Sequence, residues 1–271
     1  MRNNIKHGIH FLTSKNRRKN ILEKLSIRNE LKRISLIPRY TRFPTNIFGT
    51  TIEGLDAASF VFMYREIFET KIYQFNSNNP NPLIVDCGTN IGLSVIYFKK
   101  LFPGARIITF EPDHEIFEVA QKNFSSLALD KVEFVNNGLW HNEGIISFNK
   151  EGADGGSIAL EDQNSDYSIN VTRLSNYLKE AIDFLKIDIE GAETAVLEEC
   201  AKDLKNVKKI FVEYHSFIGE PQSIDKIMSI LTQSGFRIYL STPGLHSERP
   251  FMYINTYNNM DLQVNIFGIR E

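Results

Sequence analysis

The sequence predicts an α/β protein built on a doubly wound, mostly parallel sheet. Apolar runs and amphipathic runs alternate from residue 83 onward, which is typical of strands joined by covering helices. The first apolar run ends in Asp86 and leads into a glycine-bearing turn, and the second ends in Glu111. Because ligands bind at the carboxyl ends of such strands, these two positions predict a nucleoside crevice.

The alternation places the individual elements of the main domain. We expect strands at 83–87, 106–111, 131–136, 183–188, 207–214, 236–240 and 262–269. We expect helices at 92–102, 113–127, 192–203 and 221–234. Glycine-rich, alternating segments interrupt the pattern near 143–172 and predict an inserted β-hairpin.

Three segments follow from these patterns: a basic helical arm at 1–45, a cap or lid with a linker at 46–80, and the main domain at 81–271. Residues 1–42 hold twelve Lys and Arg against two acids, although the whole chain carries a net charge of only −2. Such an arm can bind an anionic membrane surface or a lipid-linked substrate. It can also pack on the domain or on a second copy in a homodimer, with its charges solvated, and we favour this interpretation.

The totals describe an ordinary globular chain. Its 271 residues are 42% hydrophobic and 24% charged. Cys87 and Cys200 lie in apolar segments and are expected to be buried free thiols of a reducing compartment. No apolar run approaches the roughly eighteen residues of a membrane span, and no secretory segment is visible. We therefore expect a cytoplasmic protein, with the arm placing it at the inner membrane surface if it binds lipid.

The turn after Asp86 narrows the choice of nucleoside. A dinucleotide fingerprint would need glycines where the chain has Asn90 and Leu93, and a P-loop sequence is absent. What remains is Asp-x-Gly-x-x-x-Gly, which resembles motif I of S-adenosylmethionine (SAM) methyltransferases. Glu111 lies about one βαβ unit further on, where a carboxylate can bind ribose hydroxyls.

A second group of polar residues follows the later strands. Asp188 ends the strand FLKID and Glu190 follows it, and Glu213 and His215 lie at the carboxyl end of the next strand, so the four should converge on one crevice. His215 or one of the carboxylates can act as a general base toward an acceptor hydroxyl. Alternatively, Asp188, Glu190, Glu213 and His215 can hold a divalent cation such as Mg²⁺, Mn²⁺ or Ca²⁺. In the structural alternative, Glu190 and Glu193 charge the first helical turn and His215 is an edge residue; for Glu193 we favour this interpretation.

The segments VDCGTNIGLS, FEPD, NNGLW, LKIDIEGAE and FVEYH together resemble the FkbM-type SAM-dependent methyltransferases over roughly residues 80–240. The resemblance implies a class I methyltransferase fold whose last strand is antiparallel, a place that LQVNIFGIR can fill. It also implies O-methylation of sugar hydroxyls or of polyketide and peptide natural products. Asn90 departs from the usual middle glycine and Gly138 from the usual alanine.

By position, the resemblance assigns the cofactor contacts. The methionine end of SAM would meet Asp86, Gly88, Asn90 and Gly92, and the ribose would meet Glu111. The adenine would be flanked by Asn137, Gly138 and Leu139. Asp188 would lie near the methionine amine and the reacting centre, and the loop 152–158 would border the acceptor.

The expected activity is therefore methyl transfer from SAM to a hydroxyl of a glycan or a natural product. Methylation of RNA or DNA is one rival, favoured by the basic arm. It is opposed by the acidic main domain and by the lack of an Asn/Asp-Pro-Pro-aromatic motif or a Pro-Cys dipeptide. A non-catalytic SAM-binding scaffold in a surface-glycan assembly is the other rival.

Overall fold

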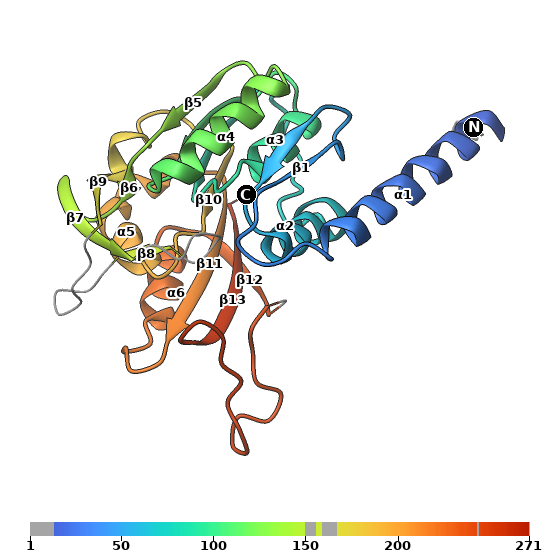
Figure 1. The fold of residues 1–271 in the computed structure, drawn as a ribbon. Coiled ribbons are helices and arrows are strands. Elements are labelled where there is room, and N and C mark those ends of the chain that lie inside the picture. Colours follow the sequence, from blue (N-terminus) through green and yellow to red (C-terminus); the bar gives the residue numbers. More distant parts are fainter. Residues whose placement is uncertain (1–13, 150–155, 159–166, 243, 271) are drawn as a thin grey trace, which may run out of the picture.

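A seven-stranded sheet forms the centre of the protein (Figure 1). The computed structural model describes residues 14–149, 156–158, 167–242 and 244–270. The strands are β3 (Leu83–Cys87), β4 (Arg106–Phe110), β5 (Val132–Val135), β10 (Phe184–Ile187), β11 (Lys209–Phe217), β12 (Arg237–Ser241) and β13 (Met260–Ile269). Their order is β12-β13-β11-β10-β3-β4-β5, and only β13 runs antiparallel to its neighbours. This confirms the predicted doubly wound fold of class I type, including its antiparallel last strand.

The strand order fixes where a ligand can bind. The chain builds β3, β4 and β5 outward in one direction and then returns to place β10 and β11 on the other side of β3. The loops that follow β3 and β10 therefore leave the sheet in opposite directions. A crevice opens at such a switch point, beyond the carboxyl ends of the two strands.

Helices cover both faces of the sheet because side chains alternate along its strands. On β3, Ile84 points into one core and Leu83 and Val85 into the other. The first core includes residues of α3 (Leu93–Leu101) and α4 (His114–Ser126). The second includes residues of α5 (Glu193–Cys200) and α6 (Ile224–Gln233), together with the 3₁₀ turns η2 (Leu174–Asn176) and η3 (Leu204–Asn206).

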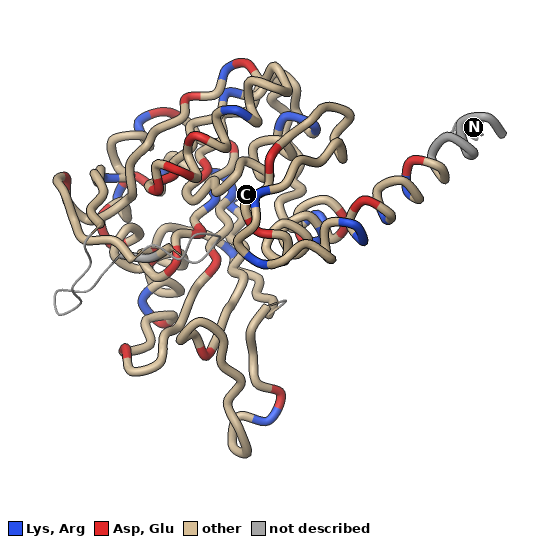
Figure 2. Tube along the Cα trace, viewed as in Figure 1, with Lys and Arg blue, Asp and Glu red and all other residues tan. Residues whose placement is uncertain are grey.

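The N-terminal segment packs on the first core only in part. Helix α1 (Ser14–Ile34) extends away from the body (Figure 1), and only its last turn buries apolar side chains, Leu31 and Ile34. Leu22 is 66% exposed, and the charged residues along α1 have both signs (Figure 2). A strand pair follows, β1 (Phe43–Thr45) and β2 (Ile52–Gly54), and then α2 (Ala57–Tyr64) continues into the π-helix η1 (Arg65–Thr70).

The interruption after β5 forms a second, smaller sheet. It contains β6 (Gly138–Leu139), β7 (Gly144–Asn149), β8 (Ser157–Ile158) and β9 (Ser168–Thr172), in the order β6-β9-β7-β8. Strand β7 pairs antiparallel with β8 on one side and with β9 on the other. The expected acceptor loop at 152–158 lies outside the described residues up to residue 155.

Both cysteines are free and buried, as expected. In the ranges that the structure describes, no helix combines the length and the apolar character needed to cross a bilayer.

Candidate active site

A pocket opens at the switch point of the large sheet. Its floor comes from the turn after β3 and from β4, β10 and β11, and its sides come from α2 with η1 and from the small sheet. The residues that line it are Phe62, Met63, Glu66, Ile67, Tyr73, Gly88, Thr89, Asn90, Leu93, Ser94, Phe110, Glu111, Pro112, Asp113, Ile116, Asn137, Gly138, Leu139, Phe148, Gly156, Ile169, Lys186, Asp188, Ile189, Glu190, Ala192, Glu213 and Gln263.

The turn after β3 contains two glycines that have a positive φ and a close neighbour, so a side chain would be strained at either position. Gly88 has a φ of +86°, and a Cβ on it would lie 1.8 Å from the carbonyl oxygen of Asp188. Gly92, with a φ of +94°, begins α3 behind the pocket wall, where a Cβ would meet the ring of Phe124 at 2.3 Å. Asn90 has a φ of +50°, a left-handed conformation that Asn tolerates better than most residues, which explains how it replaces the usual middle glycine.

The structure places Asp86 beneath this turn and not on the pocket wall. Its buried carboxylate accepts hydrogen bonds from the hydroxyls of Thr89 (2.9 Å) and Ser94 (2.6 Å). It also lies 3.3 Å from the ammonium group of Lys186. Asp86 thus holds the residues that line the pocket and does not reach the space inside.

Lys186 is a site residue that the sequence analysis missed. It is fully buried in the middle of β10, and its Nζ donates to the carbonyl oxygen of Gly88 at 2.7 Å and lies 3.2 Å from Asp188. Burial alone would lower the pKa of Lys186, but the carboxylates of Asp188 and Asp86 outweigh it and raise that pKa above its usual range. The sequence did contain a signal for Lys186, which is a lysine inside an otherwise apolar strand.

Glu111 lies on the pocket wall at the end of β4. Its carboxyl group accepts hydrogen bonds from the backbone N–H groups of Asn90 (2.9 Å) and Asp113 (3.0 Å). Burial raises the pKa of Glu111 to about 8 despite these donors. The next part of the wall is Asn137, Gly138 and Leu139.

Close packing against the small sheet explains why a glycine occupies position 138. A Cβ at this position would lie 2.8 Å from Ile169 and 3.2 Å from Val171 of the small sheet. Glycine therefore lets β9 approach the wall closely, and an alanine here would require Ile169 to move.

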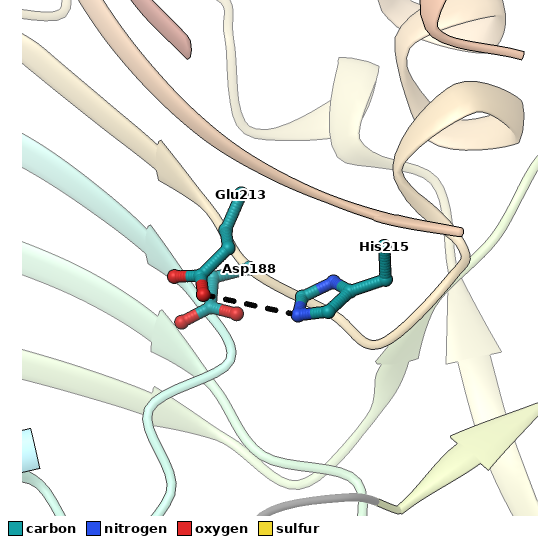
Figure 3. Close-up of side chains that lie close together, drawn as sticks. All are labelled: Asp188, Glu213 and His215. Atoms are coloured by element: carbon teal, nitrogen blue, oxygen red, sulfur yellow. Dashed lines mark ion pairs between the residues drawn. The ribbon is translucent and has the colours of Figure 1, made fainter. Parts of the chain in front are cut away.

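The four polar residues expected at the other end of the pocket do converge there. Asp188, Glu190 and Glu213 line the pocket, whereas the side chain of His215 is only 1% exposed and lies behind them. His215 Nε2 lies 3.6 Å from Glu190. It lies 3.9 Å from Glu213, the ion pair drawn in Figure 3. Burial tends to lower the pKa of His215, but the carboxylates of Glu190 and Glu193 raise it well above its usual value.

Glu193 joins the loop before α5 to the histidine. Its carboxylate accepts hydrogen bonds from the N–H groups of Ile189 (3.2 Å) and Gly191 (3.0 Å) and lies 3.0 Å from Nδ1 of His215. Glu213 also contacts the side-chain amide of Gln263, from β13. Burial and the charge of Asp188 raise the pKa of Glu213 well above its usual value.

A further carboxyl group that the sequence analysis missed comes from the N-terminal segment. Glu66, on the π-helix η1, lines the pocket with Phe62 and Met63. Burial and the charge of Asp188 raise the pKa of Glu66 to about 7. No local pattern distinguishes this glutamate from Glu69 one turn later, so nothing in the sequence pointed to it.

The domain described as "Methyltransferase FkbM domain" matches residues 86–238. The chain belongs to the FkbM methyltransferase family. This confirms the family suggested by the motifs, and with it a SAM-dependent methyltransferase as the class of enzyme. The match begins at Asp86 and ends in β12, so it includes Glu111, Asp188, Glu190 and Glu213 but not Glu66 or Gln263.

The chain resembles several curated methyltransferases, among them the following three. It is 29% identical to methyltransferase sdnD of Sordaria araneosa, over 65% of this chain and 82% of that protein. It is 24% identical to the 31-O-demethyl-FK506 methyltransferase FkbM of Streptomyces tacrolimicus, over 70% of this chain and 86% of that protein. It is 28% identical to the 2-O-methyltransferase NoeI of Sinorhizobium fredii, over 50% of this chain and 64% of that protein.

Proposed function

We propose that this enzyme transfers the methyl group of SAM to a hydroxyl of an uncharged acceptor, either a glycan or a natural product. Two of the three relatives carry an O-methylation in their names, which supports oxygen as the attacking atom. The observation that carries the choice of acceptor is the acidic end of the pocket, where Asp188, Glu190 and Glu213 lie together.

In the proposed orientation, the cofactor spans the pocket from Glu111 to Asp188. The Glu111 carboxylate would accept hydrogen bonds from the ribose hydroxyls, and Asn137 to Leu139 would flank the adenine. The methionine end would lie on the turn of Gly88 and Asn90. This orientation points the sulfonium methyl toward the acidic end, where the carboxylates stabilise the positive charge of the sulfonium group.

The reaction is an in-line displacement at the methyl carbon. An oxygen–carbon bond to the acceptor forms as the carbon–sulfur bond breaks, and S-adenosylhomocysteine (SAH) leaves with the electron pair. Alignment of the two reactants can supply roughly 7–11 kcal/mol of the rate enhancement. The hydroxyl proton must pass to a base, which can add roughly 10²–10⁴-fold.

Glu190 is the base that we propose, because its carboxylate lines the pocket. His215 is the other candidate from the sequence, but its ring lies behind the carboxylates, so we propose that it acts through Glu190, 3.6 Å from its Nε2. The test is turnover of the Glu190→Ala and His215→Ala variants at saturating SAM. We expect both to fall by at least 10²-fold while SAH affinity changes little; near-normal turnover in both would overturn the assignment.

The acceptor class is tested with labelled SAM and a panel of neutral oligosaccharides, hydroxylated macrolides and RNA. We expect label in a neutral hydroxyl acceptor and none in RNA, because carboxylates at the reacting end repel phosphates. Label in RNA, with binding that falls steeply with salt, would favour the nucleic-acid rival. SAH binding without transfer to any acceptor would favour the non-catalytic scaffold.

The remaining expectations stay predictions. Helix α1 exposes Ile21, Leu22 and Leu25 beside its basic residues, a surface suited to peripheral membrane contact or to a second copy of the chain. Sedimentation with anionic vesicles and the molar mass in solution would distinguish the two. A cytoplasmic location, and the division of the chain near residues 45 and 80, likewise stay predictions.

A further inference from the structure

The group formed by Asp188, Glu213 and His215 has the composition and geometry of a metal site. One ligand atom from each residue lies within 4.8 Å of the other two, and the three side chains point toward one another (Figure 3). Ligand atoms that share an ion at about 2.1–2.3 Å lie about 3–4.5 Å apart, so small side-chain rotations would close the site. His215 Nε2 and Glu213 Oε1, 3.9 Å apart, already have such a spacing.

The surroundings of His215 fix which nitrogen faces this group. Glu193, which is not one of the three residues, lies 3.0 Å from His215 Nδ1, and both side chains are 1% exposed. A hydrogen bond between Nδ1 and this carboxylate turns Nε2 to the opposite side of the ring, where Glu190 (3.6 Å), Glu213 (3.9 Å) and the side-chain amide of Gln263 (3.4 Å) lie. A cation bound there would replace the proton on Nε2. A carboxylate behind a histidine is the usual arrangement of a metal-bound histidine, in which it sets the tautomer and orients the ring.

The charges at this end of the pocket also point to a cation. Asp188, Glu190 and Glu213 all line the wall, and the carboxylates of Glu190 and Glu213 lie 3.6 Å and 3.9 Å from His215 Nε2. Among the residues that line the pocket in the described part of the chain, the one Lys or Arg is Lys186. Its ammonium group is shared between Asp86 and Asp188, and it meets Asp188 through Oδ2. The second oxygen of Asp188 can therefore turn to an ion.

We propose that Asp188, Glu213 and His215 bind a divalent cation of the Mn²⁺ type. Carboxylates suit Mg²⁺, Ca²⁺ and Mn²⁺, whereas imidazole suits the transition metals, and Mn²⁺ accepts both kinds of ligand. Asp188 is 24% exposed and faces the pocket, so an ion here leaves positions for water or an acceptor oxygen. The role of the ion in catalysis rests on the proposed function. The ion would lower the pKa of the acceptor hydroxyl, whose proton would pass to Glu190.

The binding itself is tested without SAM and without an acceptor. The full chain is freed of metal with a chelator and titrated with MnCl₂, by calorimetry and by the loss of the free Mn²⁺ electron paramagnetic resonance signal. We expect saturable binding of one ion per chain. No saturable binding at millimolar Mn²⁺ would overturn the proposal and would leave methyl transfer itself unaffected.

Variants locate the ion. Glu213→Gln keeps the shape of the side chain and should weaken Mn²⁺ binding at least tenfold, as should His215→Ala. Glu193→Gln should weaken it about 10–100-fold through the histidine. The matched control is Glu198→Gln on the same helix as Glu193, an exposed residue paired with Lys226, and it should bind like the natural protein. Equal affinity in Glu213→Gln and the control would place the ion elsewhere and would also overturn the proposal.

Discussion

Replacing Glu111 by glutamine should make the protein more resistant to rising pH while weakening its cofactor binding. The carboxyl group is 6% exposed, and its pKa of about 8 means that the folded protein holds a proton that the unfolded chain, with a value near 4.5, has released. Folding stability therefore falls as pH rises from about 4.5 to about 8, because the unfolded state binds fewer protons in this window. Glutamine does not titrate and removes this loss.

The size of the effect follows from the shift. Each unit of pKa difference corresponds to about 1.4 kcal/mol, so between about pH 5 and about pH 8 the natural protein should lose roughly 3 kcal/mol that the variant keeps. Urea unfolding followed by the fluorescence of Trp140, the single tryptophan, measures this at both pH values. Glu133→Gln, an exposed carboxyl on the neighbouring strand β5, is the control and should follow the natural protein.

The same substitution tests the cofactor contact. Ribose hydroxyls that donate to the carboxylate would favour its charged form, so SAH binding near neutral pH should release a proton. Calorimetry in two buffers of different ionisation enthalpy detects this proton, which should be absent in Glu111→Gln. The variant should bind SAH roughly 10–100-fold more weakly, since hydrogen bonds to charged groups contribute about 1.5–3 kcal/mol. Parallel stability curves for the two proteins, or unchanged SAH affinity, would refute this reasoning.

Two further substitutions probe the floor of the pocket. Gly88→Ala should abolish SAH binding, because the new Cβ would overlap the carbonyl oxygen of Asp188. The control is Gly219→Ala, at a position with a φ of +90° and open space around it. This control should lose only about 1–2 kcal/mol of stability through strain and should bind SAH normally. Equal effects in the two variants would contradict the close approach of the turns. Lys186→Met should destabilise the protein by about 3–5 kcal/mol in urea unfolding, because it leaves Asp86 buried without its cation; a loss below about 1 kcal/mol would show that this ion pair is dispensable.

Apolar runs and their turn residues were sufficient to predict the central sheet. All seven expected strands occur. The central strands β3 and β10 are buried on both faces, whereas the edge strands β5 and β12 have only half-buried or exposed side chains. The strand ends then placed Glu111 and Asp188 on one edge, since parallel strands present their carboxyl ends together. Glu213 lines the same pocket, although β11 continues past it to Phe217.

Residues that reach the pocket through tertiary packing could not be predicted in this way. Glu66 arrives from a π-helix that precedes the sheet, and nothing in its local sequence indicates which face of that helix meets the pocket. Asp86 points into the layer beneath the turn, whereas Lys186 lines the pocket from inside β10, so position along a strand did not determine which side chains line the pocket. His215 shares its strand with Glu213 but lies behind the wall, because Glu193 holds its ring there.

One pocket should hold SAM with its methyl group directed at Asp188 and Glu190, which follow β10, and at Glu213, which lies within β11. A crystal structure of the protein with SAH bound tests it most directly. We predict density with the ribose hydroxyls on the Glu111 carboxylate, the adenine beside Leu139, and the sulfur nearest to Asp188. Density for SAH in the reverse orientation, or at another site, would contradict the account.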